Sequence, residues 1–132
     1  MASAVMSGIR LNRDISREAY KRLSYRKQEI SKDEALRIAG DFADIVRSSI
    51  DSNAKLFIFG SAVNGSAKID SDIDVAVISE INDRDIIAGY VLFSKLANDI
   101  DWDIEVHAVS TAEWHKNNTP HVFEIKNRGV EV

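Results

Sequence analysis

Three short runs of strand-forming residues, separated by segments with helical spacing, set the strongest limit on how this chain can fold. The strand-like runs are KLFIF at 55–59, DIDVAVI at 72–78 and DWDIEVHAV at 101–109. Helical spacing is found at 32–50, 83–98, 111–116 and 120–127. This order of helices and strands predicts an α/β (α+β) fold, in which helices flank one small mixed sheet.

The segment 32–50 carries the clearest helix signals. Ser31 and Glu34 have the spacing of a capping box, in which the Ser31 hydroxyl accepts a hydrogen bond from the backbone N–H of Glu34. The apolar face repeats about every 3.6 residues, through Ala35, Ile38, Phe42, Ile45 and Ser49, flanked by Ala39 and Val46. In the segment 83–98 the residues predicted to point inward are Ile86, Ile87, Tyr90, Val91, Phe93 and Ala97.

Length and composition favour one domain preceded by a basic segment. The chain has 132 residues, 45% hydrophobic and 29% charged, which is enough to bury a core. Residues 1–30 hold seven basic and three acidic side chains, whereas the rest of the chain holds ten basic and eighteen acidic ones. We therefore predict a basic N-terminal arm at 1–30 and a single domain at 31–132. The arm is either a solvated helix face or a contact surface for an acidic partner, and it matches no nucleic-acid-binding motif.

Features that are absent from the sequence narrow the class of protein further. There is no cysteine, which excludes disulfides and thiolate metal sites and fits a reducing compartment. The first residues lack the basic and apolar regions of a signal peptide, and no apolar run approaches membrane length. We therefore expect a cytoplasmic protein without a membrane partner.

Two aspartates stand two residues apart at the start of the second strand-like run. Because residues i and i+2 of a strand share a face, Asp72 and Asp74 are predicted to project side by side. Two carboxylates so close cost energy unless they reach water or a cation, and Mg²⁺ suits them because it takes hard oxygen ligands. The third run offers Asp101, Asp103 and Glu105 with the same period. One of these acids is predicted to complete a triad that holds two metal ions, although a solvated strand face is the simpler reading for Asp101.

A Gly-Ser pair ends the first strand-like run and indicates a phosphate site. Gly60 permits a tight turn and a close approach of a ligand to the backbone. A short helix starting at Ser61 would add free N–H groups and a hydroxyl. A nucleoside triphosphate with Mg²⁺ satisfies both the Gly-Ser pair and the aspartate pair.

Together these residues resemble the minimal nucleotidyltransferases of the DNA polymerase beta superfamily. The signature of that family is an apolar residue, Gly-Ser, a short helix and loop, and then Asp-apolar-Asp on the next strand. Here it reads FGSAVNG at 59–65 and SDIDVAV at 71–77. The resemblance covers residues 33–132 and includes DIEVHAVSTAEW and the ending FEIKNRGVEV.

The resemblance implies roles for the acidic residues. Mg²⁺ or Mn²⁺ would be bound by Asp72, Asp74 and a third carboxylate, which would also help to activate the attacking hydroxyl. Glu105 fits the Glu-apolar-His pattern best, while Asp103 is the more usual residue type, and both are expected on one strand face. His107 is expected on the opposite face from Glu105, without a role in the site.

The resemblance also implies a binding loop for ATP or another nucleoside triphosphate. Gly60 and Ser61 would hold the phosphates, with Gly65 in the same loop. The family often carries an arginine soon after Gly-Ser, whereas this sequence has Ala-Val-Asn at 62–64. Lys68 is the residue that could replace this arginine, as a point charge rather than a planar fork.

Two functions follow from the resemblance. The first is an enzyme that transfers a nucleoside monophosphate, with AMP from ATP as the expected case, onto a hydroxyl. Minimal nucleotidyltransferases often form the antitoxin half of a toxin–antitoxin pair, so the expected acceptor is a HEPN-type partner protein. The second is a weakly active or inactive binding module that neutralises such a partner by contact. A homodimer is a further expectation, because a small open sheet leaves edges to cover.

Overall fold

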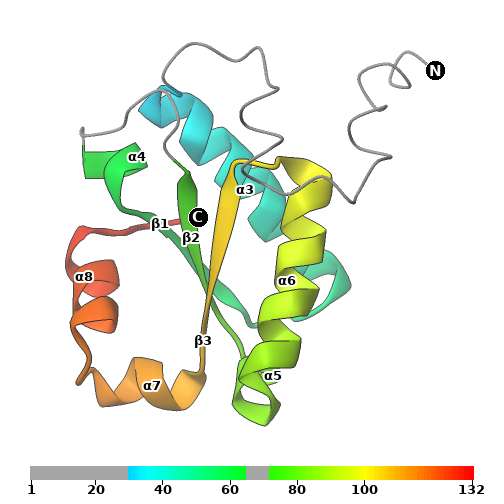
Figure 1. Cartoon of the computed structure of the whole chain (residues 1–132), viewed down its shortest axis with the longest axis vertical. Coiled ribbons are helices and arrows are strands. Elements are labelled where there is room, and N and C mark those ends of the chain that lie inside the picture. Colours follow the sequence, from blue (N-terminus) through cyan, green and yellow to red (C-terminus); the bar gives the residue numbers. More distant parts are fainter. Residues whose placement is uncertain (1–29, 65–71) are drawn as a thin grey trace.

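The described part of the protein folds around one four-stranded mixed sheet with helices on both faces (Figure 1). The computed structural model describes residues 30–64 and 72–132. The strands are β1 (Lys55–Phe59), β2 (Ile73–Ile78), β3 (Ile104–Val109) and β4 (Val130–Glu131). The helices are α3 (Lys32–Ser49), α4 (Ser61–Asn64), α5 (Glu80–Arg84), α6 (Ile86–Ile100), α7 (Thr111–Lys116) and α8 (Pro120–Arg128). This architecture confirms the predicted α/β (α+β) fold with a small mixed sheet.

The strands are ordered β3-β2-β1-β4 across the sheet. β1 runs antiparallel to both β2 and β4, while β2 and β3 run parallel. The antiparallel register places Phe59 opposite Asp74, and the parallel register places Asp74 opposite Glu105. The end of β1 therefore meets the beginnings of β2 and β3 at one end of the sheet.

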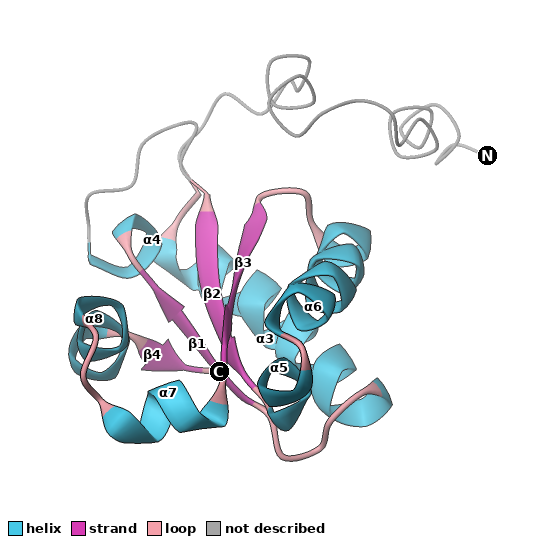
Figure 2. Cartoon of the chain, turned by 60° about the horizontal axis from the view of Figure 1, so that its bottom comes forward, coloured by secondary structure: helices cyan, strands magenta, loops and turns pink. Residues whose placement is uncertain are grey.

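One face of the sheet, here called the α3/α6 face, is a continuous apolar surface. Its strand residues are fully or almost fully buried: Leu56, Ile58, Ile73, Val75, Val77, Ile104 and Val106. Phe42 and Val46 of α3 and Phe93 of α6 pack in the same cluster. Figure 2 shows α3 and α6 on this side of the sheet and α7 and α8 on the other.

The opposite face, here called the α7/α8 face, has a second and smaller core. This core consists of Phe59, Ala76, Ile78, Val109, Trp114, Val122 and Ile125. Trp102 is also buried, so both tryptophans lie in the interior. Beyond this core the same face carries polar side chains, which form the site described below.

Helix α3 has the predicted start and most of the predicted buried face. The Ser31 hydroxyl accepts a hydrogen bond from the Glu34 N–H at 3.0 Å. The buried residues are Ala35, Ile38, Ala39, Phe42, Ala43 and Val46. Ile45 and Ser49 are exposed, contrary to the prediction, because the buried stripe runs through Phe42, Ala43 and Val46 instead.

The predicted helix 83–98 is two helices, and its apolar side chains are less buried than expected. Asp85 ends α5 and caps α6, where its carboxylate accepts hydrogen bonds from two backbone N–H groups. The buried positions of α6 are Gly89, Phe93 and Ala97. The predicted inward placement is wrong for four side chains, which are exposed: Ile86, Ile87, Tyr90 and Val91. The side of α6 that carries Gly89 is the buried side, because a glycine at this position allows α6 to lie close to Asn82 of α5.

The third strand begins later than predicted. Asp101 closes α6, and its carboxylate accepts a hydrogen bond from the Asp103 N–H at 2.8 Å. This local turn keeps Asp101 and Asp103 out of the strand, so β3 starts at Ile104. The prediction that Asp103 shares a strand face with Glu105 is therefore wrong. β1 and α7 have the predicted bounds.

Asn82 joins the far ends of β2 and β3. Its side chain is buried, and its Nδ2 donates to the carbonyls of Val77 at 2.8 Å and Val109 at 3.0 Å. These hydrogen bonds tie the two parallel strands together at the end of the sheet away from Gly60.

No helix within the described residues is both long and apolar enough to span a membrane. The predicted basic arm, Gly65 and Lys68 lie outside the described residues.

Candidate active site

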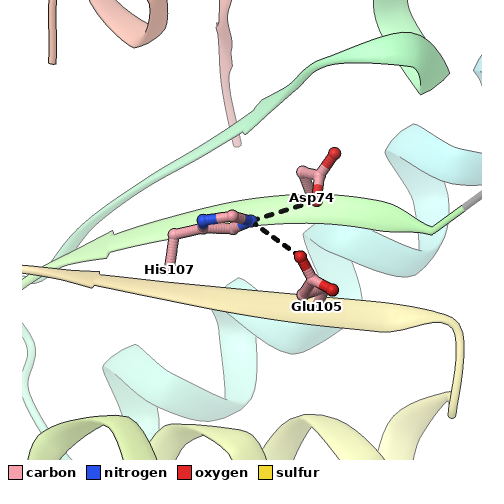
Figure 3. Close-up of polar contacts among 3 residues, drawn as sticks. All are labelled: Asp74, Glu105 and His107. Atoms are coloured by element: carbon pink, nitrogen blue, oxygen red, sulfur yellow. Dashed lines mark hydrogen bonds and ion pairs between the residues drawn. The ribbon is translucent and has the colours of Figure 1, made fainter. Parts of the chain in front are cut away.

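Two carboxylates from adjacent strands face each other at the end of the sheet near Gly60. Asp74 of β2 is in register with Glu105 of β3, and both side chains stand on the α7/α8 face (Figure 3). The Asp74 side chain is 23% exposed and that of Glu105 is 43% exposed. Solvent and a small ligand can therefore reach both groups, although neither is fully hydrated.

His107 completes this cluster. Its Nε2 lies 3.0 Å from Oδ1 of Asp74 and 3.3 Å from Oε1 of Glu105 (Figure 3). The prediction that His107 lies on the face opposite Glu105 is wrong, because residues i and i+2 of a strand share a face. The alternation used for the aspartate pair could have placed this histidine correctly.

Two aromatic rings hold the imidazole of His107. The ring centroids of Phe59 and His121 lie 4.9 Å and 5.3 Å from that of His107, and the two rings also contact each other at 5.5 Å. His121 comes from α8, so a helix distant in the sequence contributes to the site. No local pattern in the sequence indicated this role for His121.

Asp72 lies just before β2 and interacts with Glu105. The pKa of Glu105 is raised, first by burial, then by a side-chain hydrogen bond with Asp72 and by the charges of Asp72 and Asp74. The nearby His107 acts in the opposite direction on this pKa. A cation would relieve the repulsion, and hard carboxylate oxygens are the ligands that Mg²⁺ and Mn²⁺ accept, so these residues fit a divalent metal ion.

Gly60 is required where β1 ends. Its φ angle is +77°, and a Cβ atom at this position would lie 2.6 Å from Oδ2 of Asp74. The chain then turns into α4, where the N–H groups of Val63 and Asn64 donate to the Gly60 carbonyl. Gly60 and the Asp74 carboxylate thus lie side by side.

The predicted site residues are only partly brought together. Among the described residues, the His, Asp and Glu ligand atoms that lie within 4.8 Å of one another belong to Asp74, Glu105 and His107. Asp103 lies before β3, and its carbonyl accepts a hydrogen bond from the Ile73 N–H at 2.8 Å. Of the two candidates for the third carboxylate, Glu105 is therefore the one whose side chain clusters with Asp74.

A separate pocket of about 170 Å³ lies near Lys55, Ser79 and Trp114. It shares no lining residue with the carboxylate cluster, and it opens where β1 begins and β2 ends. We locate the candidate active site at the cluster because acidic side chains from two strands converge there beside Gly60, whose positive φ angle brings the backbone close to Asp74.

Comparison with known families gives one match. The family model of the nucleotidyltransferase domain matches residues 40–132, a span that includes Gly60, Asp74 and Glu105. No curated protein matches the chain.

Proposed function

The chain belongs to the nucleotidyltransferase domain family, and from this premise we propose that it transfers a nucleoside monophosphate, AMP from ATP, to a hydroxyl of a partner protein. In this reaction the hydroxyl oxygen forms a bond to the α-phosphorus. The bond from that phosphorus to the bridging oxygen breaks, and pyrophosphate leaves. The proton of the hydroxyl passes to a carboxylate of the site.

One observation carries the proposal: Asp74 and Glu105 are in register on adjacent strands, directly beside Gly60. Asp72, Asp74 and Glu105 would hold the metal ions, as the family resemblance implies. When bound, Mg²⁺ or Mn²⁺ would neutralise charge on the phosphates and orient the attacking and leaving oxygens. Gly60 and Ser61 would bind the triphosphate, with Gly65 and Lys68 as further contacts.

Glu105 is our candidate for the proton acceptor. It is the acid of β3 that stands in register with Asp74, which puts a carboxylate beside the proposed metal site. Asp103 remains the alternative by residue type. Glu105→Gln should therefore lower the rate more than Asp103→Asn.

The exposed part of α6 supports a protein as the acceptor. Ile86, Ile87, Tyr90 and Val91 are exposed on the first two turns of the helix, and Ile87 is 72% exposed. Consecutive exposed apolar side chains are typical of a surface that binds another protein. We propose a HEPN-type partner as its occupant, and a second copy of the chain as the competing one.

The test is label transfer from ATP in the presence of Mg²⁺ and the protein encoded by the neighbouring gene. Transfer from ATP labelled at the α-phosphate, and none from ATP labelled at the γ-phosphate, is expected. Asp74→Asn should reduce the rate by about a thousandfold or more, because it removes a carboxylate that would bind the metal. The matched control is Asp41→Asn, since Asp41 is an exposed acid of α3 paired with Arg37.

The alternative is a binding module, and the exposed α6 surface favours it equally. If Asp74→Asn still neutralises the partner while Ile87→Asp does not, contact through α6 is the function and transfer is not. Failure to transfer label to any partner, together with no rise in melting temperature on adding ATP and Mg²⁺, would contradict the enzyme proposal.

A further inference from the structure

We propose that His107 is itself a metal ligand and that, with Asp74 and Glu105, it forms a site for a divalent transition-metal ion such as Mn²⁺. This inference rests on the proposed function only in placing a cation at Asp74. It adds a nitrogen donor to a site that the sequence alone presents as purely carboxylate.

The spacing of the three donor atoms fits one ion. His107 Nε2 lies 3.0 Å and 3.3 Å from the carboxylate oxygens of Asp74 and Glu105, and all three donor atoms lie within 4.8 Å of one another. With metal–ligand bonds of about 2.0–2.2 Å, neighbouring ligands of a tetrahedral or octahedral ion lie roughly 2.8–3.6 Å apart. Both contacts of the imidazole nitrogen fall in that range.

Hydrogen bonding alone explains this arrangement less well. The Nε2 atom carries at most one hydrogen, yet it faces oxygens that come from two different strands. One N–H group directs its hydrogen along a single line and cannot serve both acceptors well. A metal ion between the three groups would satisfy all of them and neutralise the carboxylates.

The orientation of the imidazole is fixed in advance. Phe59 and His121 contact the ring of His107, with centroid distances of 4.9 Å and 5.3 Å. Phe59 is buried and belongs to the core of the α7/α8 face. Ligands held by packed neighbours lose less freedom when they bind a metal, so this support favours metal binding over a mobile surface histidine.

A nitrogen donor changes which metal is preferred. Mg²⁺ prefers an all-oxygen shell, whereas imidazole suits first-row transition metals such as Fe²⁺, Ni²⁺ and Zn²⁺, with Mn²⁺ at the weak end of this series. His107 therefore raises the affinity for a transition metal more than it raises the affinity for Mg²⁺. The loss of this one side chain should reduce the preference rather than remove all metal binding.

The experiment measures Mn²⁺ and Mg²⁺ binding to the full chain by calorimetry, without nucleotide. His107→Ala should weaken Mn²⁺ binding about tenfold or more and change Mg²⁺ binding by less than about threefold. The matched control is His115→Ala, because His115 is an exposed histidine of α7 outside the cluster. His107→Gln is the second variant, which removes the imidazole but keeps a polar side chain of similar reach.

A spectroscopic readout tests the ligand directly. In the wild-type protein, pulsed electron paramagnetic resonance of bound Mn²⁺ should show coupling to an imidazole nitrogen, and the coupling should disappear in both His107 variants. Absence of this coupling in the wild type, or absence of Mn²⁺ binding, would overturn the inference. So would unchanged or tighter Mn²⁺ binding in His107→Ala, since that result identifies His107 as a positive counter-ion that competes with the metal.

The two proposals can fail separately. Nitrogen-coupled Mn²⁺ binding without label transfer from ATP would leave the histidine ligand in place and contradict the enzyme. Label transfer without nitrogen coupling would do the reverse.

Discussion

The two faces of the sheet are built from the same strands but differ in how much of each face is apolar and buried. On the α3/α6 face every strand position in the core is apolar and buried beneath two long helices. On the α7/α8 face the apolar positions stop partway along the strands, and Asp74, Glu105 and His107 occupy the remainder. One face is therefore apolar along its whole length, while the other has polar groups in part of its core, and two of these groups are carboxylates that repel each other.

This difference predicts that substitutions on the two faces have separable effects. A change on the α3/α6 face should alter the free energy of unfolding and leave metal affinity intact in the folded protein. A change in the carboxylate cluster should alter metal affinity strongly and the free energy of unfolding only slightly. The three predictions below test this separation, in order of decreasing expected effect.

The largest effect is expected from Phe42→Ala. Phe42 is fully buried against the α3/α6 face, and its truncation should lower the free energy of unfolding by about 3–5 kcal/mol. Urea denaturation measures this change, and calorimetry at a temperature where the variant is folded should show unchanged Mn²⁺ affinity. A large loss of metal affinity in the folded variant would mean that the two faces are coupled.

An intermediate effect is expected from Gly60→Ala, because this change should affect both the stability of the protein and the position of the Asp74 carboxylate. The left-handed backbone at this position costs a side chain about 1–2 kcal/mol, and the new methyl group would displace the Asp74 carboxylate. Both stability and metal affinity should therefore fall.

Gly40→Ala in α3 is the matched control for Gly60→Ala. Apart from the adjacent residues and the backbone of the helix itself, no atom lies within 4 Å of a Cβ placed at Gly40, so this change should stabilise the protein by about 0.5–1 kcal/mol. Equal effects of the two substitutions on metal affinity would contradict the proposed contact between Gly60 and Asp74.

The smallest effect is expected from Glu105→Gln in metal-free buffer. Because the pKa of Glu105 is raised in the folded protein, the folded state holds this proton more tightly than the unfolded chain does. The stabilising contribution is complete below the unfolded pKa and is lost as the pH rises through the folded pKa. At neutral pH the substitution should therefore raise the melting temperature, by about 1–3 °C for this partly exposed group.

The predicted rise in melting temperature can be checked by its dependence on pH and on added metal. The advantage of Glu105→Gln should shrink as the solution is made acidic, and Mn²⁺ should stabilise the wild type more than the variant. Glu124→Gln, at an exposed position of α8, should show neither trend. A variant that is less stable than the wild type at neutral pH would show that the Glu105 charge is stabilised by its surroundings.

Local signals were sufficient for much of the fold and for part of the candidate site. Ser31 capped its helix as predicted, and the end of β1 at Gly60 followed from the change in residue type. Alternation along a strand is a local property and indicated an acidic position at Asp74, whereas Asp72 lies just before β2 and the cluster is completed by Glu105 and His107. The roles of these residues in binding ATP and metal remain predictions.

Part of the site could not be predicted because distant segments meet there, whereas the face of His107 was a local error that alternation along the strand would have corrected. The pairing of Asp74 with Glu105 depends on how two strands align, and the contact of His121 with His107 depends on where α8 packs. Neither arrangement has a short-range signal. The exposed side chains of α6 were misplaced because the close packing of Gly89 against Asn82, rather than average hydrophobicity, decides which side of that helix is buried.

The hydrogen bonds of Asn82 have a consequence far from Asn82 itself. If β3 slipped by one residue along β2, Ile104 and Val106 would turn toward the carboxylate of Asp74. Glu105 and His107 would then face the hydrophobic core beneath α3 and α6. Asn82 donates hydrogen bonds to both strands at their other end and so opposes such a slip. A side chain that touches no site residue thus decides which chemistry the sheet presents.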